Sequence, residues 1–288
     1  MAALYLHVPF QEPPSSSEVS EFTAAVVQEM ERYARSSYGD ASFQALYVGG
    51  GRPSLLPAAA LRTLVEAVHR TFDASDIEEA TFEPCPANAS TSFLETLREH
   101  GFTRLSIDPR SLGDEELRQL LRHTLEVGFE SVSVDLYFGD TEQSLSTWKT
   151  SLHRAVDLRI PHVTLHEREP EQAQSDEDER ADRFAFAMRF LGAKGYEQYE
   201  LTHFARPGHR SQYQEHVYAH GNVLGLGPGA ESFWWPDRTD PSTAQRWSNV
   251  SDVATYVERL RTDASPVAHR EAFDRPELAR EYILLRPR

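Results

Sequence analysis

Cysteine and lysine are nearly absent from this sequence, which has one cysteine, Cys85, and two lysines among 288 residues. A single thiol excludes a disulfide framework. It also excludes any iron–sulfur cluster or zinc site that takes several thiolates from this chain. No apolar run approaches the ~20 residues that span a bilayer. The first residues, MAALYLHVPF, lack the basic region of a signal peptide. We therefore expect a soluble, cytoplasmic protein without a membrane span.

Basic residues are also few, since 29 Lys and Arg side chains stand against 45 Asp and Glu side chains and the net charge is −16. An acidic surface argues against a nucleic-acid partner, because phosphate binding needs clustered cations. Two explanations for the preference for Arg over Lys remain open. One is a salt-rich cell, in which screening weakens the repulsion between carboxylates, and the other is GC-rich codon usage.

Strand-like and helix-like hydrophobic patterns alternate through the first part of the chain. Apolar spacings of three and four predict helices over residues 19–33, 61–72, 93–97, 115–125, 145–158 and 179–193. Short apolar runs predict strands over residues 4–8, 43–48, 81–83, 104–107, 131–136, 162–165 and 197–201. This alternation is typical of right-handed crossover units and a parallel sheet. The number of units falls short of a closed barrel, so we predict an α/β fold with a partial (β/α)6-type parallel barrel.

The pattern suggests two parts, a barrel over residues 1–205 and a C-terminal extension over residues 206–288. Residues 167–182 (EREPEQAQSDEDERAD) are expected to form a charged loop that runs into the next helix. The extension has no repeat and carries an aromatic cluster at Phe233-Trp234-Trp235 and Trp247. The chain stops directly after an apolar run, so we expect that its end lies within an element.

Ligands of parallel barrels bind at the carboxyl ends of the strands. The residues there include a triple glycine, Gly49-Gly50-Gly51, and the carboxylates Glu83 and Asp135. Glycines allow a close approach of the backbone to a ligand, but a plain tight turn explains them equally well. The spacing of a dinucleotide or P-loop motif is missing. Asp135 ends an apolar run and should have a partner, with Arg104 and Arg122 as candidates.

Several motifs together carry a family resemblance. In order along the chain they are LYLHVPF, YVGGGRPSLL, TFEPCP, GFTRLSI, SVDLYFG, GYEQYELTHFARPG and LGLGPGAESF. The chain resembles the radical S-adenosylmethionine family of oxygen-independent coproporphyrinogen III oxidases, and most closely its haem-chaperone branch. This resemblance implies a partial α/β barrel with a C-terminal extension, of which the last portion of the family's C-terminal domain is absent here.

The sequence departs from the family where the family binds its cluster. The resemblance implies a CxxxCxxC motif directly after HVPF, but these three positions are Gln11, Ser15 and Glu18. Ser15 and Glu18 instead have the spacing of a capping box that starts the first helix. We therefore expect no iron–sulfur cluster and no reductive cleavage of S-adenosylmethionine.

The resemblance also places a cofactor pocket and two substituted positions in it. The S-adenosylmethionine-type pocket would use Tyr5, Gly49, Gly50, Gly51, Glu83, Arg122 and Asp135. Arg52 and Arg110 stand where the family has threonine and glutamine, so retention and loss of S-adenosylmethionine both stay open. Unpaired buried carboxylates are costly. We therefore predict that Arg52 or Arg110 reaches into this pocket and pairs with Glu83 or Asp135.

Haem is the other ligand that the resemblance suggests. The haem-chaperone branch carries HNxxYW just before LGLG, and the corresponding region here contains Tyr213, His216 and His220 as candidate ligands. An imidazole or a tyrosinate can serve as an axial haem ligand. On a helix, His216 and His220 would share one face. The alternative is that these histidines only lie on the surface.

Three functions follow from these observations. The first is a non-catalytic family member that binds or carries haem or another tetrapyrrole, or that binds a protein partner. The second is a radical enzyme of porphyrin biosynthesis, against which the missing thiolates count. The third is a metal-dependent hydrolase that uses His7, Glu83, Asp135 and His162, since these residue types suit an open metal site.

Overall fold

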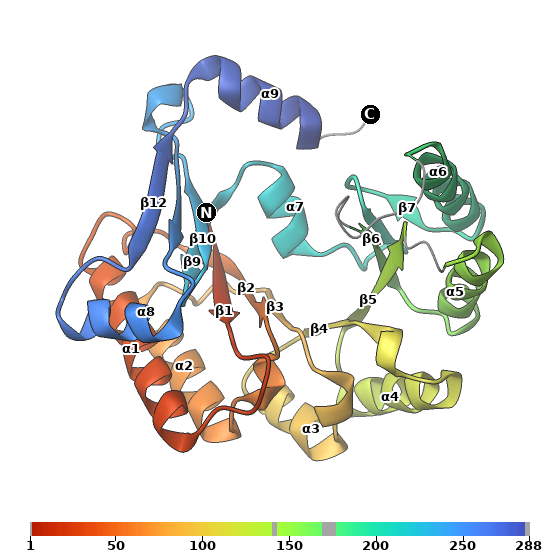
Figure 1. Cartoon of the computed structure of the whole chain (residues 1–288), viewed down its shortest axis with the longest axis horizontal. Helices are drawn as coiled ribbons and strands as arrows, with labels where there is room; N and C mark the ends of the chain where they lie inside the picture. The colour runs from red at the N-terminus through yellow and green to blue at the C-terminus, as the bar shows by residue number, and fades with distance from the viewer. Residues whose placement is uncertain (1, 140–142, 169–176, 286–288) are drawn as a thin grey trace.

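Twelve strands form a single sheet in the computed structural model, which describes residues 2–139, 143–168 and 177–285. The strand order is β12-β11-β10-β9-β1-β2-β3-β4-β5-β6-β8-β7. The central strands are all parallel: β9 (Asn222–Leu226), β1 (Ala2–Val8), β2 (Phe43–Gly50), β3 (Glu79–Phe82), β4 (Arg104–Ile107), β5 (Ser131–Phe138) and β6 (His162–Glu167). The sheet curves around α7 (Gln212–Tyr218), as Figure 1 shows. The predicted α/β class with a mostly parallel sheet is confirmed.

Helices connect the parallel strands and cover the outer face of the sheet (Figure 1). They are α1 (Ser16–Ala34), α2 (Ala58–Thr71), α3 (Thr91–Glu99), α4 (Asp114–Val127), α5 (Leu145–Asp157) and α6 (Glu177–Ala193). The predicted first helix begins as expected, because the Oγ atom of Ser15 accepts a hydrogen bond from the amide of Glu18 (3.3 Å) and the Glu18 carboxylate accepts one from the amide of Ser15 (2.8 Å). The predicted capping box is confirmed.

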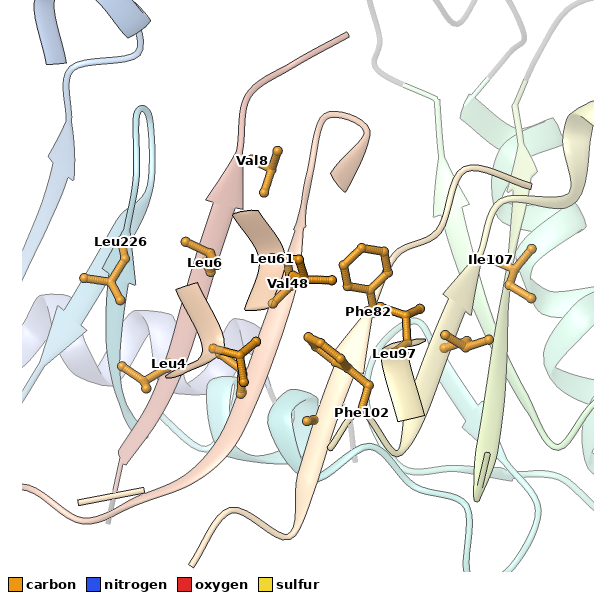
Figure 2. Close-up of a cluster of buried hydrophobic side chains, with 14 of the residues drawn as sticks. Leu4, Leu6, Val8, Val48, Leu61, Phe82, Leu97, Phe102, Ile107 and Leu226 are labelled. Atoms are coloured by element: carbon orange, nitrogen blue, oxygen red, sulfur yellow. The ribbon is translucent and has the colours of Figure 1, made fainter. Parts of the chain in front are cut away.

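The alternation of side chains along each strand separates an apolar outer face from a polar inner face. Leu4 lies opposite Leu46 of β2 and Leu224 of β9, and all three are buried. Figure 2 shows Leu4, Leu6, Val8, Val48, Phe82 and Ile107 of the sheet together with Leu61 and Leu97 of the helices. The inner face instead carries buried polar side chains: Glu79, Thr81, Arg104, Ser133 and His162. A polar interior is unusual for a packed barrel, and it indicates where ligands could bind.

A buried ion pair holds α7 inside the sheet. The Nε atom of Arg104 lies 2.8 Å from the Glu79 carboxylate, and both side chains are almost fully buried. Glu79 also accepts hydrogen bonds from Ser211 Oγ and from the amides of Gln212 and Tyr213 at the start of α7. A carboxylate at a helix N-terminus is favourable. The pair therefore fixes α7 against the inner face.

The last predicted strand differs from the structure. Residues 197–201 were expected to add a further parallel strand, but β7 (Glu197–Gln198) is short and β8 (His203–Ala205) runs antiparallel to β6. β7 follows the α6 crossover and runs in the same direction as β6, but β8 lies between them and is antiparallel to both. The prediction was wrong because the short segment after β7 reverses the chain, so that β8 rather than β7 pairs with β6. Of the predicted loop at 167–182, residues 169–176 lie outside the described part of the chain, and α6 begins at Glu177.

The residues of the C-terminal extension continue the same sheet. β9 pairs with β1, and antiparallel strands follow it: β10 (Glu231–Trp234), β11 (Gln245–Asn249) and β12 (Val267–Ala272). The helices α8 (Val253–Arg261) and α9 (Arg275–Leu285) complete this part. Among the described residues, no helix is both long and apolar enough to cross a membrane.

A buried carboxylate on α1 connects the two parts. Glu29 accepts hydrogen bonds from the hydroxyl of Tyr256 (2.5 Å), the amide of Gly227 (2.8 Å) and the side-chain amide of Asn249 (2.7 Å). Burial raises the pKa of Glu29 to about 7, although these three bonds oppose the rise. Because its donors come from β11, α8 and the loop after β9, this one side chain organises much of the extension around α1.

Candidate functional site

A cavity of about 700 Å³ lies at the carboxyl ends of the strands, where ligands of parallel barrels bind. We call it the carboxyl-end cavity. Its lining is mostly polar and includes Gln11, Gly50, Gly51, Arg52, Glu83, Cys85, Ser106, Asp108, Arg110, Asp135, Tyr137 and His166. Its size falls in the range of small-molecule sites, which is roughly 300–1,000 Å³.

Side chains of the protein fill the space beside the glycine turn at the edge of the carboxyl-end cavity. Gly50 has a φ of +106°, which a side chain would strain. A Cβ atom at Gly50 would collide with the ring of His7, and one at Gly49 would lie 2.5 Å from the Glu83 carboxylate. The space beside these two glycines is therefore filled by protein side chains. This favours the tight-turn explanation of the triple glycine over a ligand cradle.

Glu83 follows β3 directly and is held by hydrogen bonds. The hydroxyl of Tyr47 donates to Oε1 (2.5 Å), and the amide of Gly50 donates to Oε2 (3.0 Å). Burial raises the pKa of Glu83 to about 6 against the effect of these bonds, and repulsion from Asp135 adds to the rise. Glu83 is therefore a carboxyl group that changes its charge just below neutral pH.

Asp135 has a histidine partner instead of an arginine. The Nε2 atom of His166 lies 3.4 Å from Oδ1 of Asp135, and the His166 ring stacks on Tyr137 with centroids 5.0 Å apart. The prediction that Arg104 or Arg122 pairs with Asp135 was therefore wrong. Arg104 pairs with Glu79, and Arg122 pairs with Glu115 on an exposed face of α4 (3.1 Å).

The predicted arginine pairing in the carboxyl-end cavity was also wrong. Arg110 binds Asp108 through Nε (2.9 Å) and Nη2 (2.5 Å), and its guanidinium lies 4.0 Å from the centre of the Tyr137 ring. Arg52 is exposed at the rim, and no ion pair joins it to Glu83 or Asp135 within the described residues. The physical reason is proximity in the chain. Asp108 is two residues from Arg110, so this pair orders fewer side chains than a reach across the cavity.

The residues assigned by resemblance to the S-adenosylmethionine-type pocket are only partly together. Gly50, Gly51, Glu83 and Asp135 line the carboxyl-end cavity, and Gly49 borders Glu83. Arg122 lies on the surface of α4, away from this cavity. Tyr5 lies deeper, where its ring meets the rings of Tyr47 and Tyr213 at centroid distances of 6.0 and 6.4 Å.

The former cluster positions do not fit an iron–sulfur cluster. Gln11 lines the carboxyl-end cavity, while Ser15 and Glu18 bind each other in the capping box. Cys85 is a free cysteine that follows β3 and also lines this cavity. Within the described residues, no group of three His, Cys, Asp or Glu side chains is arranged to hold a metal. The side chains suggested for a hydrolase are likewise engaged elsewhere, since His7 binds the carbonyl of Pro228 and His162 binds the hydroxyl of Tyr199.

A second cavity of about 490 Å³ lies between β1, β9, β10 and α7. We call it the inner cavity. It is lined by aromatic, apolar and charged side chains: Tyr5, His7, Tyr213, Val217, His220, Val223, Glu231, Ser232, Phe233 and Arg246. An aromatic and apolar wall with a few placed polar groups is the usual composition of a binding site for a small organic molecule.

Two of the three candidate haem ligands line this inner cavity. Tyr213 is buried, and burial together with Tyr5 and Glu83 raises the pKa of its hydroxyl, which keeps it a neutral phenol. His216 is not among the lining residues, and its Nε2 atom lies 2.9 Å from the carbonyl of Asn222. Tyr213 and His216 are therefore poorly placed to act as axial ligands.

His220 is the third candidate and has a different environment. Helix α7 ends at Tyr218, so His220 lies beyond it, with a left-handed φ of +55°. The expectation that His216 and His220 share a helix face was therefore wrong. The His220 side chain is 4% exposed, its Nε2 atom lies 3.1 Å from Oε2 of Glu281, and its Nδ1 atom has no hydrogen-bond partner among the described residues. Burial lowers the pKa of this imidazole, although the Glu281 carboxylate opposes the shift.

Sequence reasoning missed several residues of this interior. Arg246 of β11 and Glu281 of α9 meet at the inner cavity through a 2.7 Å ion pair. Their positions carry no motif, and only the pairing of β11 with β10 and β12 brings Arg246 there. Glu79 was missed too, although a charged residue at the start of a buried strand is a signal that it must have a partner.

The comparisons with known proteins agree with the fold. The chain is 28% identical to the heme chaperone HemW of Mycobacterium tuberculosis, over 99% of this chain and 81% of that protein. It is 25% identical to heme chaperone HemW of Lactococcus lactis, over 76% of this chain and 62% of that protein. No family model matches the chain.

A solved structure extends this likeness to three dimensions. Coproporphyrinogen III oxidase (HemN) from Escherichia coli, a radical SAM enzyme, superimposes with a TM-score of 0.79 at 20% identity, over 98% of this chain and 74% of that one. This likeness concerns the fold and confirms the predicted partial barrel. The chain is therefore similar over nearly its full length to curated heme chaperones, it has the fold of a radical SAM enzyme, and its single cysteine leaves it without a CxxxCxxC motif.

Proposed function

We propose that this protein is a non-catalytic, cluster-less relative of the haem chaperones that binds or carries haem or a similar tetrapyrrole in the cytoplasm. The observation that carries the proposal is the inner cavity with the buried His220 at its wall, whose Nδ1 atom has no hydrogen-bond partner in the described part of the chain. A buried polar group without a partner costs free energy unless a ligand binds it.

The residues around His220 suit a haem. Its imidazole is neutral because burial lowers its pKa, and neutral imidazole is the form that coordinates iron. Phe233 lies 5.3 Å from the His220 ring and offers a flat apolar wall. Arg246 at the same end of the cavity could bind a carboxylate of the tetrapyrrole. When bound, the haem would supply the iron that His220 coordinates.

Radical chemistry is not part of this proposal. Reductive cleavage of S-adenosylmethionine needs an electron from a cluster, and the three cluster positions are Gln11, Ser15 and Glu18. Anaerobic reconstitution with iron and sulfide should leave the protein without a bound cluster. A brown protein with iron and sulfide in cluster ratio would contradict the proposal.

Titration with ferric haem tests the main proposal. We expect a Soret shift with the wild-type protein and an affinity about tenfold weaker in His220→Ala, since loss of a coordinating bond costs at least ~1.4 kcal/mol. His216→Gln is the matched control, because the glutamine amide can still donate to the carbonyl of Asn222. Failure of the wild-type protein to bind haem would refute the proposal. Equal binding by wild type and His220→Ala would remove His220 as the ligand.

The carboxyl-end cavity supports a second candidate, retained binding of S-adenosylmethionine without its cleavage. The observation in its favour is that Arg52 and Arg110 leave Glu83 and Asp135 without a cationic arginine partner. A ligand with an ammonium or sulfonium group could then balance these carboxylates. Calorimetric titration with S-adenosylmethionine tests this. Binding that weakens in Asp135→Asn supports it, and the absence of binding to the wild-type protein rules it out.

A further inference from the structure

Helix α9 buries little apolar surface against the rest of the chain. From Arg275 to Leu284, Leu278 is its one buried side chain, while Ile283 and Leu284 are 73% and 72% exposed. Figure 1 shows α9 passing above α7 in this view. With so little apolar burial, α9 must depend on specific polar contacts for its position.

Glu281 makes these contacts at the inner cavity. Its Oε1 atom lies 2.7 Å from Nη2 of Arg246, and its Oε2 atom lies 3.1 Å from Nε2 of His220. Both Arg246 and His220 line the inner cavity. One carboxylate of α9 thus occupies the two groups that a bound haem would need.

Arg246 is fixed independently of α9. Its Nη1 atom pairs with Glu271 of β12 at 3.2 Å, and its guanidinium lies 5.0 Å from the centre of the Phe273 ring. If Glu281 moved away, Arg246 would therefore stay in place, and its Nη2 group would be available to another acceptor. His220 is fixed as well, because its left-handed backbone closes the turn after α7 and its amide binds the carbonyl of Val217.

We propose that Glu281 is an internal carboxylate that occupies the His220–Arg246 end of the inner cavity, so that α9 must release it before a carboxylate-bearing, metal-centred ligand binds there. The proposal rests on the proposed function for the identity of that ligand. It predicts that α9 is a displaceable cover of the cavity. Ligand affinity then includes the cost of breaking the Glu281 contacts.

The variant Glu281→Gln removes the charge that holds α9, and Glu281→Ala removes the side-chain contact entirely. Glu277→Gln is the matched control on the same helix. Glu277 accepts a hydrogen bond from the amide of Asp274 (2.8 Å), and glutamine keeps an acceptor for it. Two readouts are needed, hydrogen–deuterium exchange of α9 in the protein without ligand and titration with ferric haem.

We expect faster exchange across α9 in both Glu281 variants than in Glu277→Gln. Haem affinity should rise by about threefold to tenfold in the Glu281 variants, because the ligand no longer has to break the Glu281 contacts, and a tenfold rise corresponds to ~1.4 kcal/mol. Equal exchange in the Glu281 and Glu277 variants would overturn the proposal. Faster exchange without haem binding by any variant would support the cover and refute the proposed function.

Discussion

Single carboxylates determine much of the chemistry of this interior. Glu79 and Glu83 are on the inner face of the sheet, Glu29 is on α1, and each accepts hydrogen bonds from donors of different elements. Hydrogen bonds to charged groups are stronger than those between neutral groups. Removal of one donor should therefore destabilise the ionised form of the carboxylate that accepts its hydrogen bond.

The pair of Tyr47 and Glu83 gives a pH-dependent prediction. The pKa of Glu83 is raised to about 6, so its contribution to stability is full at low pH and is lost as the pH rises through about 6. The Tyr47 hydroxyl favours the ionised form. We expect Tyr47→Phe to lower the free energy of unfolding by about 1 kcal/mol at pH 5 and by about 2 kcal/mol at pH 8.

Urea denaturation at these two pH values measures this effect. Tyr5→Phe is the control, since Tyr5 is also on the inner face and contacts Tyr47 by its ring. The same loss of stability at both pH values for Tyr47→Phe would contradict the assignment of the raised pKa to Glu83.

The residue scale also shows where sequence reasoning stops. The capping box of Ser15 and Glu18 could be predicted because its contacts are local in sequence. The partner of Asp135 could not, because β6 brings His166 beside it only after the sheet has formed. Arg110 was assigned to the wrong carboxylate because a near neighbour, Asp108, competes for it. His220 was placed on a helix because the left-handed residue that ends α7 is His220 itself rather than Gly221, which follows it.

At the scale of elements, the first helix begins where the sequence resemblance places the CxxxCxxC motif. A serine cap typically stabilises a helix by about 1 kcal/mol relative to alanine. The helix that it starts has 19 residues and buries Phe22, Val26 and Met30 against the sheet. Residues 15–18 therefore start a helix that packs against the sheet.

The element scale gives a second prediction. Ser15→Ala should destabilise the protein by about 1 kcal/mol, because the amide of Glu18 loses its acceptor. Ser16→Ala is the matched control, since Ser16 is the next residue and lies outside the capping box. Thermal unfolding of the two variants measures the difference. A Ser16→Ala variant as unstable as Ser15→Ala would show that the cap is not the cause.

Most strands and helices were predictable because their hydrophobic periodicity is regular. The exceptions are β7 and β8, where the sheet changes to antiparallel pairing over a short segment. The pattern of apolar residues in Glu197–Leu201 does not encode which strand this segment pairs with, and β8 takes the place beside β6.

At the scale of the whole molecule, residues 206–288 extend the sheet of residues 1–205 rather than pack beside it. β9 forms a parallel pair with β1 over Ala2–Leu6, and Glu29 of α1 binds donors from three segments of the extension. The sequence predicts a division after residue 205, but hydrogen bonds and apolar contacts cross it throughout. We therefore expect the two parts to unfold as one cooperative unit.

Tryptophan fluorescence can test this cooperativity because the tryptophans are unevenly distributed. Trp148 is in α5 of the barrel, whereas Trp234, Trp235 and Trp247 are in the extension. In Trp148→Phe, fluorescence therefore reports on the extension alone, while far-ultraviolet circular dichroism reports on all helices. Coincident urea transitions by the two probes are expected for a single unit. Separate midpoints would show two independently stable parts.

Urea unfolding of a Glu29 variant, followed by the same two probes, tests whether Glu29 joins residues 1–205 to residues 206–288. Glu29→Ala leaves the amide of Gly227, the amide of Asn249 and the hydroxyl of Tyr256 without their shared acceptor, and these groups stay buried. Each buried donor without a partner costs about 1–3 kcal/mol, so the free energy of unfolding should fall by about 3 kcal/mol or more. Because these donors belong to the extension, its transition should move to lower urea than that of the barrel. Glu31→Ala, two residues along the same helix on its exposed face, is the control and should leave both transitions unchanged. If Glu29→Ala lowers both transitions equally, the β1–β9 pairing alone is enough to keep the two parts together.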